Sequence, residues 1–142
     1  MNPVQLVAVF AENKPGQTAR VTGLLAGAGI NLRWVSVAST GPFGVMKLLV
    51  NDSQQAHQVL KSQGLAVSFL DVLAVEVEDQ PGGLHAVADC LARQQINLDN
   101  TSGFVTGRRA VLIVEAHDLP RAQAAIERAG LRVLSREDLL SL

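Results

Sequence analysis

Apolar positions along the chain follow a pattern that first appears near the N-terminus. Residues 4–10 are short, β-branched and apolar, which predicts a buried strand ending at "ENKPG". Val21, Leu24, Leu25 and Ala28 then fall at i, i+3, i+4 and i+7, and this spacing places them on one face of a helix. The segment "GAG" is predicted to end that helix.

The pattern continues with two strands, a second helix and a final strand. Partial alternation in "NLRWVSVAS" and the apolar "VMKLLV" predict a strand pair, joined by the turn-rich "TGPFG". Ala56, Val59 and Leu60 indicate an amphipathic helix ending at Gly64, and "LAVSFL" predicts the last strand. The resulting order, βαββαβ, is that of a ferredoxin-like split unit.

The same pattern occurs a second time, 66 residues later. Between residues 6 and 70, 20 of 65 positions are identical to the residue 66 positions further on. We therefore predict an α+β chain of two ferredoxin-like units, residues 1–70 and 72–142. Each unit should have an antiparallel sheet with two helices on one face. Because only two copies are present, a fused dimer with pseudo-two-fold symmetry is more natural than a solenoid.

The two predicted units follow each other almost without a linker. Only Asp71 lies between the last strand of the first copy and the first strand of the second. Residues 65–77 should therefore form a nearly continuous extended segment, and we expect close pairing with strand exchange around it. The tail "REDLLSL" is amphipathic, but its pattern does not assign it a place.

Composition removes several classes of protein. The 142 residues carry a net charge of −1 and few aromatic side chains, so nothing favours nucleic-acid binding. No apolar run is long enough for a membrane span, and the start lacks the features of a signal peptide. The single cysteine, Cys90, excludes an internal disulfide. We expect a cytoplasmic protein.

Catalytic and metal-binding patterns are missing from the sequence. There is no G-x-S-x-G, P-loop or dinucleotide fingerprint, and His57, His85 and His117 show no metal-ligand spacing. An acylphosphatase-like hydrolase needs an arginine in the loop after the first strand, whereas Arg20 lies a turn into the helix. Cys90 falls on the core face, where we expect it to be buried and inert. We therefore expect no enzyme activity, no cofactor and no metal site.

Two segments in register carry a resemblance to a known family. "NKPGQTARVTGLLAGAGINL" and "DQPGGLHAVADCLARQQINL" resemble the ACT domain. In that family a polar residue and a Pro-Gly precede an amphipathic helix, and Gly-(Ile/Val)-Asn-(Ile/Leu) leads into the second strand. The second copy departs from this pattern because Gln95 replaces the glycine. The resemblance implies a free-standing tandem ACT protein. ACT units are regulatory and usually bind small ligands, commonly amino acids, at the interface of paired units.

The Pro-Gly loop also has chemistry suited to an amino acid. Glycine lets a ligand approach the backbone closely, and the first helical N–H groups lack intrahelical acceptors, which favours a carboxylate. An asparagine side chain offers both donors and an acceptor for a zwitterion. The resemblance implies that Asn13 and Asn31 hold the ligand. The residues we expect to contact ligand are Asn13, Lys14, Gly16, Gln17, Thr18 and Asn31 in the first copy, and Asp79, Gly82, Gly83, Leu84 and Asn97 in the second.

Each of these residues also has a purely structural interpretation. The Pro-Gly pairs can serve only the turn, Asn31 and Asn97 can cap a turn, and Lys14 can be simply solvated. Asp79 stands where the first copy has Asn13, so a carboxylate ligand would be repelled there and an ammonium group attracted. The two sites are therefore expected to be unequal.

The sequence thus predicts an amino-acid-binding regulatory protein that forms a homodimer. The alternative is a regulatory subunit, like the acetolactate synthase small subunit, that acts on a partner enzyme of amino-acid metabolism without a ligand of its own. Exposed sheet edges would supply the pairing surface in either case.

Overall fold

The computed structural model describes residues 3–142, and these form two compact units. We call Gln5–Leu70 the N-terminal unit, and Asp71–Leu142 with Pro3 and Val4 the C-terminal unit. The helices and strands follow each other in the predicted order. The predicted α+β class with two βαββαβ-like units is therefore confirmed.

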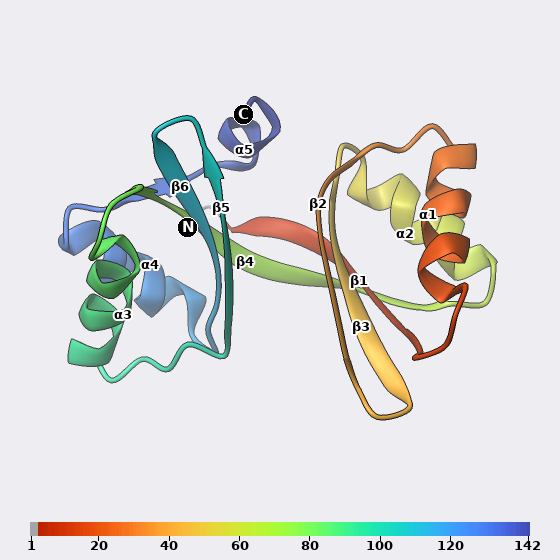
Figure 1. Cartoon of the computed structure of the whole chain (residues 1–142), viewed down its shortest axis with the longest axis horizontal. Coiled ribbons are helices and arrows are strands. Elements are labelled where there is room, and N and C mark those ends of the chain that lie inside the picture. The colour runs from red at the N-terminus through yellow and green to blue at the C-terminus, as the bar shows by residue number, and fades with distance from the viewer. Residues whose placement is uncertain (1–2) are drawn as a thin grey trace. The chain divides into compact units, whose positions relative to one another are not determined.

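Helices α1 and α2 of the N-terminal unit lie together on one face of its antiparallel strands (Figure 1). Strand β1 pairs with β3, and β3 pairs with β2 at the sheet edge. Apolar side chains of α1, such as Val21 and Leu25, are fully buried against Val7 and Val9 of β1. The elements are β1 (Val4–Glu12), α1 (Gln17–Gly27), β2 (Leu32–Thr40), β3 (Phe43–Val50), α2 (Ser53–Ser62) and the start of β4 (Ala66–Glu78).

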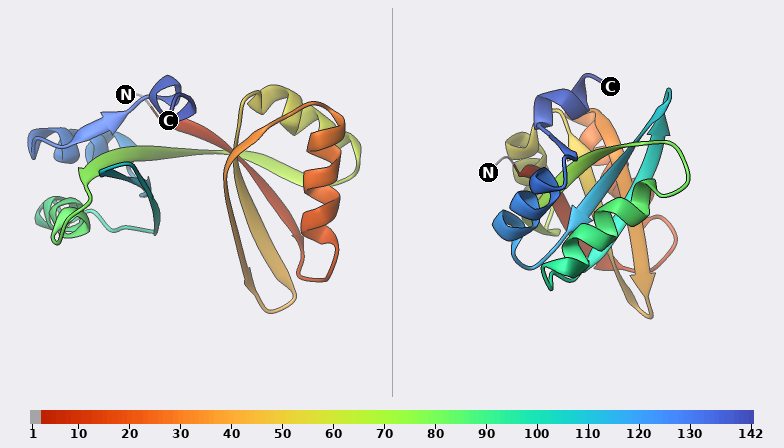
Figure 2. Two further views of the ribbon diagram at one scale, coloured as in Figure 1. Left: turned by 45° about the horizontal axis from the view of Figure 1, so that its top comes forward. Right: turned by 90° about the vertical axis from the view of Figure 1, so that its left-hand side faces the viewer.

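The C-terminal unit repeats this arrangement and adds a short helix. Strand β4 pairs with β6 and β7, and β6 pairs with β5, all antiparallel. Helices α3 and α4 run side by side, as the right-hand view in Figure 2 shows. The further elements are α3 (Gly83–Arg93), β5 (Asn100–Thr106), β6 (Arg109–Glu115), α4 (Leu119–Arg128), β7 (Arg132–Leu134) and α5 (Arg136–Leu140).

The segment between the units is a single strand. β4 is 13 residues long and begins in the N-terminal unit, so the expected extended segment is present. Strand exchange around it stays a prediction. No helix among residues 3–142 is long and apolar enough to cross a membrane.

Two local features differ from the sequence-based expectations. The strand expected from Asn97 begins only at Asn100, after a turn in which the Asn97 side-chain amide donates to Asp99 Oδ1 at 3.3 Å. The tail forms α5, which starts with a capping box: Asp138 N donates to Ser135 Oγ, and Ser135 N donates to Asp138 Oδ2. The hydrogen bond from Ser135 N, and secondarily one from the Ser135 side chain, lowers the pKa of the Asp138 carboxyl.

Each of the four longer helices is followed by a residue in the left-handed backbone conformation. Gly29, Gly64 and Gly130 take φ values of 72°, 81° and 80° after α1, α2 and α4. After α3 this position is held by Gln95, with φ at 57°. A side chain there brings Cβ close to the following carbonyl oxygen, which costs about 1 kcal/mol. The second copy thus keeps the backbone conformation while losing the residue type that suits it.

We predict that Gln95→Gly stabilises the protein by about 1 kcal/mol, because it relieves this strain. The measurement is the midpoint of urea unfolding, which should rise. Gln94→Gly is the matched control, since Gln94 has φ of −97° and gains nothing from glycine. A midpoint for Gln95→Gly that falls as it does for Gln94→Gly would contradict the prediction.

Candidate functional site

The Pro-Gly sequences form the same turn in both units. Gly16 has φ 91° and ψ −13°, and Gly82 has φ 95° and ψ −4°. A proline followed by a residue with these angles defines a type II β-turn. Each turn is closed by a hydrogen bond across its ends, from Gln17 N to Lys14 O at 3.4 Å and from Gly83 N to Gln80 O at 3.1 Å. Strand β1 or β4 is thereby redirected into a helix.

These turns leave the first amides of α1 and α3 without acceptors. Neither helix has a side-chain cap. Arg20 N and Ala86 N already bond within their own helical turns, to Gly16 O and Gly82 O. The amides before them belong to residues 18 and 19 and to residues 84 and 85, and no acceptor among the described residues meets them. Such groups, together with the helix dipole, favour an anion.

A hollow of about 50 Å³ lies beside this turn in the N-terminal unit. One wall comes from the turn and the start of α1, and the other from the β2–β3 hairpin. The register places Ala11, Gly44 and Ser39 in one cross-strand row, with Met46 and Val37 in the next. The lining residues are Ala11, Glu12, Asn13, Lys14, Gln17, Thr18, Val37, Ser39, Gly44, Val45 and Met46.

Some polar groups around the hollow have hydrogen-bond or ion-pair partners within the protein, and one has none among the described residues. Asn13 Nδ2 donates to Gly41 O at 3.1 Å, which ties the turn to the hairpin. Lys14 Nζ lies 3.3 Å from Glu12 Oε2 in an exposed ion pair. Gln17 Oε1 is buried and accepts no hydrogen bond from the described residues. An unsatisfied buried acceptor costs about 1–3 kcal/mol, and a ligand donor would recover that cost.

A second hollow occupies equivalent positions in both units. In the C-terminal unit it measures about 340 Å³ and is lined by Gly82, Gly83 and neighbouring residues of β4, β6 and β7. In the N-terminal unit it measures about 350 Å³. The eight residues lining the latter are Phe10, Ala11, Glu12, Gln17, Phe43, Gly64, Leu65 and Ala66. Each has its counterpart, 66 positions later, in the hollow of the C-terminal unit.

Side chains make these matched hollows chemically different. Arg109 replaces Phe43, and Glu76 replaces Phe10. Arg109 Nη2 lies 2.8 Å from Glu76 Oε1, and Arg132 Nη1 lies 3.7 Å from the other oxygen of that carboxylate. Glu76 is only 16% exposed, so the two arginines neutralise a largely buried charge. The C-terminal hollow is therefore charged, whereas its counterpart exposes two phenylalanines.

The geometry agrees with what comparison with known proteins shows. A family model of the ACT domain pair matches residues 1–142. The chain belongs to this ACT domain pair family. The resemblance drawn from the two Pro-Gly segments is thus confirmed.

Solved structures share the fold of this ACT pair. Protein BT0572 from Bacteroides thetaiotaomicron is 25% identical, with a TM-score of 0.92 over 99% of this chain and 97% of its own. The regulatory subunit of aspartate kinase from Thermus thermophilus, in its ligand-free form, is 19% identical, with a TM-score of 0.64 over 91% and 93%. The corresponding subunit from Thermus flavus is 18% identical, with a TM-score of 0.61. No curated protein sequence matches the chain.

The ACT units bring together only some of the expected ligand contacts. Asn13, Lys14, Gln17 and Thr18 line the smaller N-terminal hollow, and Gly82 and Gly83 line the C-terminal one. Asn31 lies outside these linings, and its N–H donates to Asn51 Oδ1 at 3.1 Å. Gly16, Asp79, Leu84 and Asn97 are also outside them. As ligand contacts, all the expected residues stay predictions.

The sequence did not identify the hairpin wall of the smaller hollow. Val37 is 50% exposed and directly opposite Met46, and Ser39 is directly opposite Gly44. A Cβ on Gly44 would lie 2.9 Å from Ala38 O, a backbone atom that cannot easily move, so this close approach favours glycine there. The alternation of Val35, Val37 and Ser39 was the available signal. Among residues 3–142, no group of three or more His, Cys, Asp or Glu residues could hold a metal ion.

We predict opposite effects for two glycine-to-alanine changes in the ACT helices. A Cβ on Gly83 would lie 2.8 Å from Glu78 O, so Gly83→Ala should destabilise the C-terminal unit by about 1–3 kcal/mol. Gly23, within α1, has no atom within 4 Å of such a Cβ, and Gly23→Ala should stabilise by up to about 1 kcal/mol. Thermal unfolding measures both, and a shift of the same sign in the two variants would contradict the packing argument.

Proposed function

We propose that this ACT pair is a regulatory protein that binds a small amino acid beside the type II turn of the N-terminal unit. The observation that carries the proposal is the uncapped start of α1 next to a polar hollow. The unbonded amides of Thr18 and Ala19, the buried Gln17 Oε1 and the Asn13 side chain all lie between residues 13 and 19. That combination suits a zwitterion.

Each end of an amino acid has suitable partners in this arrangement. The ligand carboxylate would accept hydrogen bonds from the amides of Thr18 and Ala19, where the helix dipole also favours negative charge. Its ammonium group would donate to Gln17 Oε1 and to the Oδ1 of Asn13. A hollow of about 50 Å³ is a few times the roughly 10–15 Å³ that one buried water needs, so it suits the head group of an amino acid and not a bulky side chain.

The C-terminal unit would bind differently, because its turn is flanked by other charges. Glu78 and Arg109 line a hollow of about 340 Å³ beside Gly82 and Gly83. Asp79, in place of Asn13, attracts an ammonium group and repels a carboxylate. Two ligands of unequal affinity are therefore part of the proposal.

Regulation would follow from the way the turn is held. A ligand in the N-terminal hollow contacts both the turn and the β2–β3 hairpin, so it favours the arrangement that holds them together. A ligand shifts a conformational equilibrium only by its difference in affinity between the states.

Titration calorimetry against the common amino acids, one at a time, tests the proposal. We expect heat with small amino acids, such as glycine, alanine or serine, and little with tryptophan. Binding should also raise the melting temperature by mass action. Absence of heat and of a thermal shift with every amino acid would overturn the proposal.

Two asparagine variants identify the ligand contacts. Asn13→Ala should weaken binding about tenfold, because a hydrogen bond to a charged ligand is worth about 1.5 kcal/mol. Asn31→Ala should also weaken binding if Asn31 reaches the ligand, and unchanged affinity would remove Asn31 from the site. Gln58→Ala on the exposed face of α2 is the control and should bind as the unmodified chain does.

A second candidate function, regulation of a partner enzyme without a ligand, is favoured by the edge strands. Val35 and Val37 on β2 and Val105 on β5 are 49%, 50% and 59% exposed. Pairing through these edges would bury them in a homodimer or against a partner. Sedimentation of the purified chain tests for a homodimer. An enzyme whose activity changes on adding the ligand-free chain would support the second function.

A further inference from the structure

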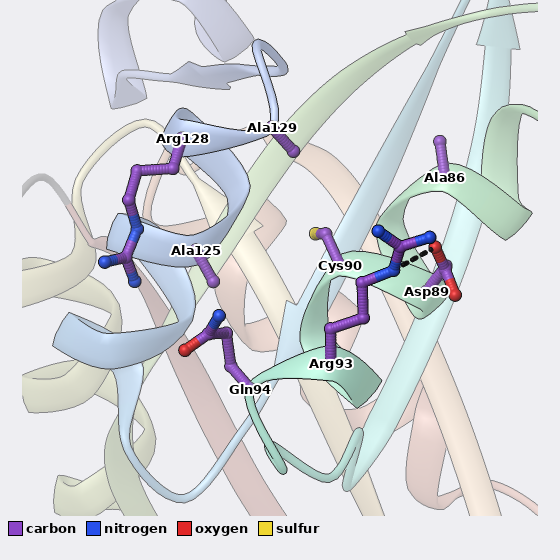
Figure 3. A pocket seen from close by; sticks show the side chains of 8 residues that line it. All are labelled: Ala86, Asp89, Cys90, Arg93, Gln94, Ala125, Arg128 and Ala129. Carbon is purple, nitrogen blue, oxygen red and sulfur yellow. Dashed lines mark ion pairs between the residues drawn. The ribbon is translucent and has the colours of Figure 1, made fainter.

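A separate hollow of about 430 Å³ lies between α3 and α4 of the C-terminal unit. Its volume falls within the range of small-molecule sites, about 300–1,000 Å³. Figure 3 shows Arg128 extending from α4 and Arg93 from α3, with Cys90 between them in this view. The lining residues are Ala86, Asp89, Cys90, Arg93, Gln94, Ala125, Arg128 and Ala129. Of these, only Ala86 also lines the hollow beside Gly82 and Gly83.

The N-terminal unit shows why this space is open. There, Arg20 Nη2 donates to Gln63 O at 2.8 Å, so its side chain crosses from α1 to the end of α2. The equivalent residues 66 positions later are Ala86 and Ala129, both of which line the hollow. In the C-terminal unit, Ala86 thus replaces the arginine whose side chain spans the two helices, and the space between them is left open.

The hollow has an excess of positive charge. Arg93 Nε is paired with Asp89 Oδ2 at 2.9 Å, and Arg121 Nη2 donates to Gln94 O at 2.7 Å at its edge. The exposed Arg128 side chain forms no hydrogen bond or ion pair with the described residues. The hollow and its edge thus carry three guanidinium groups and a single carboxylate, Asp89. The N-terminal counterparts of these arginines are Gly27, Gln55 and Ser62, none of which is charged.

The floor of the hollow is apolar. Cys90 is half-buried, and its thiol donates to Val87 O at 3.2 Å. Burial, and secondarily the Asp89 charge, raises the pKa of this thiol, so it is uncharged at neutral pH. Together with the methyl groups of Ala86 and Ala125 it offers a surface for an aliphatic body.

We propose that this hollow binds a small organic carboxylate. The ligand carboxylate pairs with the free guanidinium of Arg128, assisted by Arg93, and its aliphatic part lies over Ala86, Cys90 and Ala125. Arginine suits this role because its planar fork matches a carboxylate. An inorganic phosphate would have the charge but would leave the apolar floor unused.

Cys90, the only cysteine, reports on occupancy without engineering. The experiment follows alkylation of the full chain by uncharged iodoacetamide at pH 8.5, with butyrate as the probe and chloride at equal ionic strength as the reference. We expect saturating butyrate to slow alkylation at least threefold, and inorganic phosphate to slow it much less. Equal protection by chloride or phosphate would overturn the carboxylate assignment.

Two variants taken from the matched positions sharpen the test. Arg128→Ser introduces the N-terminal unit's own residue and should abolish protection while leaving the melting temperature and the ligand-free alkylation rate unchanged. Ala86→Arg should refill the gap, so that alkylation is slow with or without butyrate. Protection that survives in Arg128→Ser would overturn the proposal. Asn13→Ala should leave protection intact, which separates this site from the turn site of the N-terminal unit.

Discussion

The type II turn between a central strand and its helix is the constraint on which the site depends. Helices α2, α4 and α5 each begin with a side-chain cap, from Asp52, Asp118 and Ser135. Helices α1 and α3 instead begin at glycines with φ near +90° and have no side-chain cap. A cap contributes about 1 kcal/mol, so the chain forgoes stability at two equivalent points and gains exposed amide donors there. The anion-favouring character of the turns follows from this single choice of backbone.

The two copies share that backbone but not the chemistry around it. Glu12 and Glu78 occupy equivalent places, whereas Phe10 and Phe43 correspond to Glu76 and Arg109. These differences place two phenylalanines in one hollow and a partly buried ion pair in the other. Since both hollows have nearly the same volume, the fold tolerates either lining. The chemical difference between the units is therefore set by side chains alone.

Much of the fold could be predicted from sequence. The repeat shows that the chain has two similar units, and the apolar spacing shows which segments are helices or strands and which of their faces are buried. The Pro-Gly turns were predictable for the same reason, since the two residue types nearly determine the turn. The hairpin wall formed by Val37, Ser39 and Gly44 was not, because it depends on strand register. The capping box at Ser135 left a readable signal, Ser-x-x-Asp, although the tail's apolar pattern alone gave it no place. That Asn31 bonds to Asn51 and does not line the hollow beside Asn13 likewise depends on tertiary structure.

Duplication also separates what folding requires from what it does not. A feature kept in both copies, such as the positive φ at Gly16 and Gly82, is one the shared backbone needs. Arg93 and Arg128 stand where a folded unit elsewhere in the same chain has Gly27 and Ser62, so the helix pair does not need their charge. Surface arginines that folding does not require, gathered around a gap that a counterpart side chain would have crossed, are free to serve binding. For this reason the α3–α4 hollow, unlike the turn backbone, can change without cost to the fold and is available for function.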